Sequence, residues 1–190
     1  MRSTRATDGG SGDSAGSVMA GDKAHGSPCV KRAIARECLT SYNESTNEMP
    51  TRNATAQWKG GLKGGTGSFK GQTGLGGSYS FGSRFGEEGG SNPEELLAAA
   101  EAACFSMALA GSLESGGFAP TSVDTQAACT VEKVGEGFKI TTMKLVVKAV
   151  VPGIDDAKFQ AIAAATKEGC PVSTALKGNV QIELTATVTA

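Results

Sequence analysis

The chain has 190 residues, of which 39% are hydrophobic and 19% are charged, and its formal net charge at pH 7 is −1. These proportions suit a folded core and exclude a chain that is disordered throughout. The balanced charge provides no basic excess for binding nucleic acid or an anionic membrane surface. The sequence has no uninterrupted apolar run of about 18 residues and no apolar secretory leader, so we expect no membrane segment.

The sequence contains a single histidine, His25, in a stretch rich in glycine, serine and aspartate. The rest of the chain therefore cannot form a Ser-His-Asp or Cys-His catalytic group, or a zinc site that uses histidine. The 5 cysteines form no C-x-x-C pair and no metal-ligand spacing. We expect no metal and no cofactor, and a chemistry that depends on cysteine, arginine, lysine or carboxylate side chains.

The first part of the chain differs from the rest in composition. Residues 8–17 read as a linker, and we expect residues 1–48 to form a flexible N-terminal extension. Cys29 and Cys38 lie in this extension and receive no role. We expect one folded domain over residues 49–190.

The start of that domain is rich in glycine. Residues 60–90 match neither a G-x-G-x-x-G nor a P-loop pattern, which argues against a nucleotide-phosphate site. We interpret this stretch as short strands joined by glycine turns. The predicted strands cover residues 54–59, 62–69 and 78–84.

A long helix follows these strands. Asn92 is a suitable cap, Pro93 suits the first helical position, and Glu95 has the spacing of a capping box. The helix is predicted to end near Gly116 and Gly117. It is apolar on nearly all sides, so we expect it to be buried in the centre of the molecule or of a dimer.

The remainder of the chain completes an α+β pattern, with two strands, two helices and a last strand. The predicted elements are strands 123–131 and 138–151, a helix capped by Asp155 or Asp156, a short helix from Cys170-Pro171 to Leu176, and a strand over 180–188. The alternation of apolar and polar residues slips near Thr141 and Thr142, which predicts a β-bulge.

Three cysteines fall within the predicted domain. Cys129 is on the inward side of a strand, where a thiol acts as a small apolar group. Cys104 lies in the middle of the long helix, so it is either a packed core thiol or a thiol activated by a nearby cation. Cys170 precedes a proline at a helix start, which is either a thiolate-stabilising position or a cap without redox function.

One cation and one carboxylate are candidates for activating Cys104. Arg84 is the only arginine after residue 52, and its planar guanidinium can hold a carboxylate and a thiolate together. Glu94 lies in the first turn of the helix that carries Cys104. An arginine from the preceding loop can bridge these two groups; the alternative is a surface arginine beside a solvated glutamate.

These residues resemble the OsmC/Ohr family of thiol peroxidases, and the OsmC branch in particular. The run Asn92–Leu109 looks like the helix that carries the family's peroxidatic cysteine, and Cys170-Pro-Val-Ser173 looks like its second-cysteine motif. Arg84 and Glu94 match the family's arginine and its glutamate partner. Glu101 departs from the pattern, because OsmC members commonly have histidine there.

The resemblance implies an OsmC-like α+β fold: antiparallel sheets, a long central buried helix, and an intertwined homodimer whose active sites use both chains. It also implies that Cys104 attacks a hydroperoxide, that Arg84 stabilises the thiolate and Glu94 orients Arg84, and that Cys170 then forms a disulfide with Cys104. An external dithiol, of lipoyl or another thiol type, would reduce this disulfide in a reducing cytoplasm.

The apolar residues Leu97, Phe105 and Met107 suggest a preference for organic hydroperoxides over hydrogen peroxide. Two other functions stay open: a dimeric, non-catalytic binding protein for an apolar ligand, and a redox sensor whose disulfide changes a partner interaction. The presence of all four candidate residues favours catalysis. The sensor hypothesis lacks a DNA-binding segment or basic patch.

Overall fold

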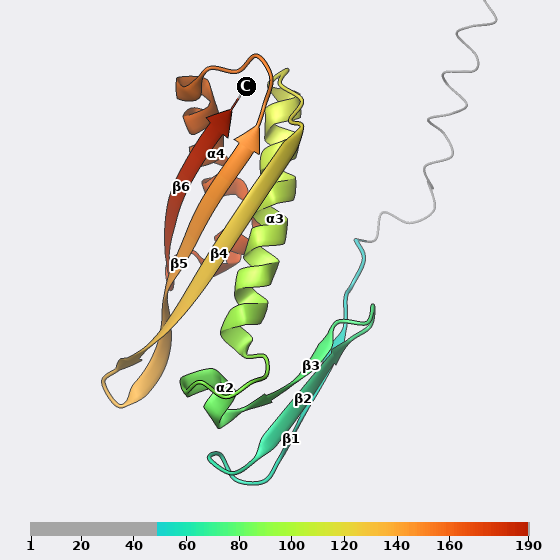
Figure 1. The fold of residues 1–190 in the computed structure, drawn as a ribbon, viewed down its shortest axis with the longest axis vertical. Coiled ribbons are helices and arrows are strands. Elements are labelled where there is room, and N and C mark those ends of the chain that lie inside the picture. The colour runs from blue at the N-terminus through green and yellow to red at the C-terminus, as the bar shows by residue number, and fades with distance from the viewer. Residues whose placement is uncertain (1–48, 190) are drawn as a thin grey trace, which may run out of the picture. The chain divides into compact units, whose positions relative to one another are not determined.

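The computed structural model describes residues 49–189 (Figure 1). The expected flexible extension over residues 1–48, with Cys29 and Cys38, lies outside the described residues. The part of the chain that carries the candidate residues belongs to one compact unit, Arg52–Ala190. It contains two three-stranded sheets and the long helix between them in sequence.

The first sheet is antiparallel, with strands β1 (Ala54–Lys59), β2 (Thr66–Gly71) and β3 (Gly76–Ser80) in that order. The first predicted strand is confirmed. The second was placed too early, and the third was extended too far. Glycine turns precede β2 and β3, and β-propensity does not locate where pairing begins after such turns.

The third strand ends early because Ser80 caps a short helix, α2 (Phe81–Phe85). The Ser80 hydroxyl accepts a hydrogen bond from the Ser83 backbone, and the Ser83 hydroxyl accepts one from the Ser80 backbone. This reciprocal pair satisfies two backbone donors at the helix start. Arg84 therefore lies on a helix and not on the predicted strand.

Aromatic rings cover one face of the first sheet. The ring centres of Trp58 and Tyr79 are 5.4 Å apart, and those of Phe69 and Tyr79 are 6.4 Å apart. Gly67 lies beneath these rings, and a β-carbon there would clash with both Trp58 and Tyr79. Glycine is required at this position so that the rings can approach the backbone.

The long helix α3 spans Pro93–Ser115 and is capped by Asn92, whose side chain accepts a hydrogen bond from the Glu95 backbone. The predicted start and the predicted end at Gly116 are confirmed. The capping box is not complete, because the Glu95 carboxylate accepts a hydrogen bond from Ser91 at 2.8 Å. Side-chain capping at Asn92 alone defines where α3 begins.

Among the described residues, α3 is buried along one stripe only. The opposite side is open to solvent, with Ala99 and Ala100 exposed and Met107 75% exposed. The described elements therefore do not bury the helix on all sides, and the alternative expectation, that it is buried in the centre of a dimer, stays a prediction. The buried side chains are Glu94, Glu101, Phe105, Leu109 and Leu113.

By length and composition, α3 is also able to cross a membrane. Its few carboxylates leave a long window almost free of charge, although the sequence has no uninterrupted apolar run of that length, and the expectation of no membrane segment stays a prediction. The core helix of a soluble protein meets the same criterion.

The second sheet has the order β4-β5-β6, with β4 (Ser122–Val134) and β5 (Gly137–Val150) forming an antiparallel hairpin. Their register shifts between Thr130 and Val131, opposite Thr141, so the predicted bulge is confirmed. The last strand, β6 (Gln181–Thr189), pairs with β5 in parallel. The prediction of antiparallel sheets is thus wrong for this pairing, because two helices bring the chain back so that β6 begins opposite Thr142 and runs in the direction of β5.

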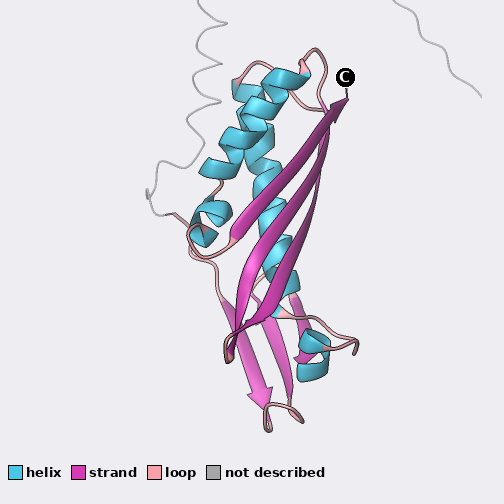
Figure 2. Ribbon diagram, turned by 90° about the vertical axis from the view of Figure 1, so that its left-hand side faces the viewer, coloured by secondary structure: helices cyan, strands magenta, loops and turns pink. Residues whose placement is uncertain are grey.

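Those two helices are α4 (Asp156–Gly169), capped by Asp155, and α5 (Pro171–Leu176). Figures 1 and 2 show α3 and α4 on the same face of the second sheet. The core forms between this face and the helices. Its buried apolar residues are Phe105, Leu109, Leu113, Met143, Leu145, Val147, Ala149, Val151, Ile154, Phe159, Ala163 and Cys170.

Leu109 has no exposed surface and lies in this core. We predict that Leu109→Ala lowers the free energy of unfolding by about 2–5 kcal/mol, because it removes buried methyl groups and leaves a cavity. Denaturant unfolding followed by circular dichroism measures this change. Leu62, which is 69% exposed, provides the control. An equal loss in Leu62→Ala would contradict the assignment of the core.

Candidate active site

Two thiols meet where α5 packs against α3. The Cys170 thiol donates to the sulfur of Cys104 with a Sγ–Sγ distance of 3.2 Å, although the two residues are 66 positions apart. Cys170 is 1% exposed and Cys104 is partly exposed. The sulfurs are in contact, so forming a bond of about 2.05 Å between them needs a movement of roughly 1 Å.

Cys170 lies between α4 and α5 and occupies the cap position of α5, as the Cys-Pro pair had predicted. Its backbone N–H donates to the Thr166 carbonyl at 2.8 Å, while its side chain makes no cap hydrogen bond. The sulfur is therefore free to face Cys104. Pro171 suits this arrangement, because the first helical position needs no hydrogen-bond donor.

The surroundings of Cys104 within one chain favour the neutral thiol. Burial raises the pKa of Cys104, and the neighbouring Cys170 and Glu101 raise it further. A hydrogen bond from the Val172 backbone acts in the opposite direction. A thiol with this environment needs a cation before it becomes an effective nucleophile at neutral pH.

Glu101 and Ser173 form a second polar contact between the same two helices. The Ser173 hydroxyl donates to Oε1 of Glu101 at 2.5 Å, and the two side chains are 2% and 0% exposed. Oε2 of Glu101 has no hydrogen-bond partner among the described residues. Sequence reasoning identified Glu101 only as a departure from a family pattern and gave Ser173 no role.

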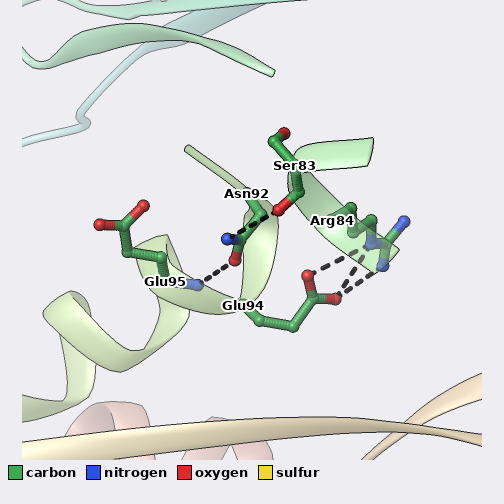
Figure 3. A network of polar contacts seen from close by, with 5 residues as sticks. All are labelled: Ser83, Arg84, Asn92, Glu94 and Glu95. Atoms are coloured by element: carbon green, nitrogen blue, oxygen red, sulfur yellow. Dashed lines mark hydrogen bonds and ion pairs between the residues drawn. The ribbon is translucent and has the colours of Figure 1, made fainter. Parts of the chain in front are cut away.

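Arg84 and Glu94 form a two-point ion pair, seen in Figure 3. Nη2 of Arg84 donates to Oε1 of Glu94 at 2.7 Å, and Nε donates to both carboxylate oxygens at 3.2 Å. Glu94 is 6% exposed, so the arginine partners a carboxylate that would otherwise be buried without charge compensation. This geometry is specific to a guanidinium.

Helix α2 is held against the start of α3 by hydrogen bonds that position this pair, and Figure 3 shows the one between Asn92 and Ser83. The Ser83 hydroxyl donates to the Ser91 carbonyl at 2.9 Å, and the Asn92 amide donates to the Ser83 carbonyl at 3.4 Å. Asn92 thus caps α3 and contacts α2 with one side chain. The backbone of Arg84 is placed by these neighbours as well as by its own ion pair.

The two pairs of candidate residues remain separate within one chain. Cys104 follows Glu94 by ten positions on α3, which corresponds to about 15 Å along the helix axis. Among the described residues, no hydrogen bond joins Arg84 to Cys104, so one arginine does not bridge Glu94 and Cys104 here. The structure brings together Arg84 with Glu94, and Cys104 with Cys170.

An apolar hollow of about 200 Å³ lies beside Arg84. Half of the residues in its wall are aromatic, and the centre of the Phe85 ring lies 5.0 Å from the guanidinium carbon of Arg84. Phe105, which the sequence had suggested as an apolar neighbour of a substrate, is instead wholly buried in the core. The residues around the hollow are Trp58, Leu62, Tyr79, Ser80, Phe81, Arg84, Phe85 and Pro93.

The third described cysteine, Cys129, has an environment that suits a structural role. It is partly buried and packs against the core. Burial raises the pKa of its thiol, and the charge of Glu94 adds to that effect. Among residues 49–189, no cluster of three or more His, Cys, Asp or Glu side chains is placed to hold a metal ion.

Comparisons with known proteins place this geometry in context. Residues 86–185 match the family described as OsmC-like protein. The peroxiredoxin OsmC of Escherichia coli is 44% identical over 134 residues, which cover 70% of this chain and 94% of that protein. An organic hydroperoxide resistance protein of Xanthomonas axonopodis is 33% identical over 97 residues, covering 50% of this chain and 66% of that protein.

Solved structures have the same fold. The organic hydroperoxide resistance protein OhrB of Bacillus subtilis has a TM-score of 0.57 at 28% identity, and the match covers 71% of this chain and 98% of that one. A protein from Legionella pneumophila, titled an organic hydroperoxide resistance protein OsmC, has a TM-score of 0.57 at 27% identity, covering 75% of this chain and all of that one.

The double role of Asn92 generates a prediction. Asn92→Ala removes the cap of α3 and the contact with Ser83, so we expect the free energy of unfolding to fall by about 1 kcal/mol. Urea unfolding of the purified variant measures this loss. Asn53→Ala, at an exposed asparagine that within residues 49–189 hydrogen-bonds only Gln72, is the control and should change little. Equal stability of the two variants would argue against the capping role.

Proposed function

Because the chain belongs to the OsmC family, we propose that it is a cysteine-based peroxidase that reduces organic hydroperoxides through Cys104 and Cys170. Its relatives are named peroxiredoxin OsmC and organic hydroperoxide resistance protein, which supports a peroxide-related redox role. The observation that carries the proposal for these two residues is the 3.2 Å contact between their sulfurs.

The reaction proceeds in three steps. The Cys104 thiolate attacks one oxygen of the hydroperoxide, the O–O bond breaks, and the alcohol leaves after taking up a proton, so Cys104 becomes a sulfenic acid. The Cys170 thiol then displaces the hydroxyl group, which leaves as water with the thiol proton, and a disulfide forms. An external dithiol, of lipoyl or another thiol type, reduces the disulfide in the reducing cytoplasm.

The first step requires a thiolate, and within one chain the groups around Cys104 raise its pKa. We infer that the missing cation is Arg84 of a second copy of the chain. Nη1 of Arg84 makes no hydrogen bond among the described residues, and the side chain is 35% exposed. Arg84 can therefore hold Glu94 of its own chain and still reach a thiolate of the partner.

The open face of α3 is where we propose that the second copy binds. Small side chains at Ala99 and Ala100 lie there, beside an apolar hollow of about 500 Å³ whose wall also includes Leu96 and residues of the first sheet. In a twofold dimer, the same surface serves both chains. When two α3 helices cross in antiparallel orientation at Ala99, Glu94 of one helix lies beside Cys104 of the other. Glu94 and Cys104 are each five residues from Ala99, on opposite sides of it.

The aromatic hollow beside Arg84 favours hydroperoxides with an apolar body. Such a substrate can bury its hydrocarbon part against the rings while its O–O group lies near the guanidinium. Hydrogen peroxide has nothing to bury there. Cumene hydroperoxide is therefore the appropriate test substrate and hydrogen peroxide the comparison.

We predict that Cys104→Ser abolishes the consumption of cumene hydroperoxide with a dithiol reductant, because the serine hydroxyl is a poor nucleophile at neutral pH. Cys170→Ala should still lose its Cys104 thiol to one equivalent of peroxide but form no disulfide. Mass spectrometry after alkylation distinguishes these products.

Cys129→Ser is the matched control and should retain wild-type turnover. Full peroxidase activity in Cys104→Ser would refute the mechanism. A chain that binds apolar ligands but leaves the peroxide unchanged would instead be the non-catalytic binder. A disulfide that forms without catalytic turnover would favour the redox sensor.

A complementation experiment tests whether Arg84 acts across a dimer. Arg84→Ala and Cys104→Ser should each be inactive, but a mixed dimer would contain one intact site, with Arg84 from one chain and Cys104 from the other. An equal mixture that is unfolded and refolded together should regain about a quarter of wild-type activity, since half the dimers are mixed and each has one of two sites.

Mixing the two folded variants without exchange is the control for this experiment, and it should remain inactive. If refolded mixtures also stay inactive while Arg84→Ala refolds to dimers, Arg84 acts on its own chain and the proposed arrangement is wrong. Size-exclusion chromatography with light scattering establishes the oligomeric state of each sample.

A further inference from the structure

Glu101 is a buried carboxylate that the three steps above do not use. It lies on α3 one turn before Cys104 and has no exposed surface. Only one of its two oxygens is hydrogen-bonded within the described residues. Burial of a half-paired carboxylate costs folding free energy, so an apolar residue would serve the core better.

The partner of Glu101 lies on the same short helix as the second cysteine. Ser173 follows Cys170 by three residues, and Cys104 follows Glu101 by three residues. Residues three apart lie on the same face of a helix. Two side-chain contacts therefore join these antiparallel segments: Glu101 with Ser173, and Cys104 with Cys170.

The two contacts differ in strength. The contact between two neutral thiols is weak, whereas a hydroxyl that donates to a carboxylate makes a stronger, more directional hydrogen bond. Glu101 and Ser173 are both buried, so water does not compete with the hydrogen bond between them. Since α5 has only six residues, a single strong contact can determine how its first turn sits on α3.

We propose that Glu101 is a positioning residue for disulfide formation: through Ser173 it holds α5 in the register that keeps the Cys170 sulfur against Cys104. This inference rests on the pairing of Cys104 with Cys170 in the proposed function. The hydrogen bond at Oε1 accounts for the effect: the carboxylate charge strengthens this bond, and a neutral oxygen in the same place still accepts from Ser173.

Three variants separate the hydrogen bond from charge and from packing. Ser173→Ala removes the donor. Glu101→Gln removes the charge but keeps an oxygen that accepts from Ser173. The double variant Glu101→Leu with Ser173→Ala replaces both members by apolar groups and leaves no unpaired polar atom, so it should fold even if the first variant does not.

The control is another hydroxyl–carboxylate pair. The Thr141 hydroxyl donates to Glu132 at 2.6 Å, but this contact is exposed and lies in the β4–β5 hairpin. Glu132→Leu therefore removes a bond of the same chemistry that has no link to either cysteine. It should leave disulfide formation unchanged.

The first measurement does not depend on peroxide. Each full-length protein is equilibrated with reduced and oxidised glutathione, and the fraction of Cys104–Cys170 disulfide is determined by alkylation and mass spectrometry. In this exchange the Cys170 thiol attacks Cys104 joined to glutathione, the mixed disulfide breaks, and reduced glutathione leaves. The equilibrium measures the effective concentration of one thiol at the other.

We expect the effective concentration to fall by at least about tenfold in Ser173→Ala and in the double variant, and to stay within about threefold of wild type in Glu101→Gln and Glu132→Leu. Unchanged values in the first two would overturn the proposal. A loss in Glu101→Gln equal to that of the double variant would also overturn it, since the charge would then be the cause.

The second measurement adds one equivalent of cumene hydroperoxide and follows its consumption and the disulfide separately. Ser173→Ala should consume peroxide within about threefold of the wild-type rate but accumulate a sulfenic acid that dimedone traps. If wild type consumes no peroxide, the proposed function fails, while the glutathione equilibrium still decides the role of Glu101. Equally slow consumption and disulfide formation in Ser173→Ala would contradict a role confined to positioning Cys170.

Discussion

The contact between the sulfurs of Cys104 and Cys170 depends on how the C-terminal helices return to α3. Helix α4 packs on α3, and the chain turns at Cys170. Helix α5 then begins antiparallel to α3, so that Cys170 lies against Cys104 and Ser173 against Glu101. This one packing arrangement brings the two thiols into contact, places Glu101 against Ser173 and buries the core residues of α3. The second sheet supports it by covering the core side of both long helices.

A second constraint is the length of α3. The helix carries Glu94 in its first turn and Cys104 near its middle, about 15 Å apart. A rigid helix does not shorten this distance, so the ion pair of Arg84 with Glu94 and the thiol pair are separate units in a single chain. The proposed dimer reconciles them by placing the ion pair of one chain at the thiols of the other. The exposed small residues of α3 are compatible with such close packing of two helices.

Much of the fold was predictable from local signals. The cap at Asn92, the glycines after α3, the bulge at Thr141 and the Cys-Pro helix start are confirmed, because each depends on residues within a few positions of one another. The parallel pairing of β5 with β6 was not predicted, since it depends on the path of α4 and α5. The helix that begins at Ser80 was also missed, because a serine pair can cap a helix within a sequence that reads as a strand.

The sequence by itself determined which residue types are available for chemistry: three cysteines in the domain, one arginine after residue 52, and no histidine beside them. It also determined that Glu94 and Cys104 share a helix, since helical periodicity and capping are local properties. Only the tertiary structure decided that Cys170 contacts Cys104, that Arg84 pairs with Glu94 and, among residues 49–189, not with Cys104, and that Glu101 is buried against Ser173. These contacts join residues from different elements, so they follow from how the elements pack, which no spacing along the chain specifies.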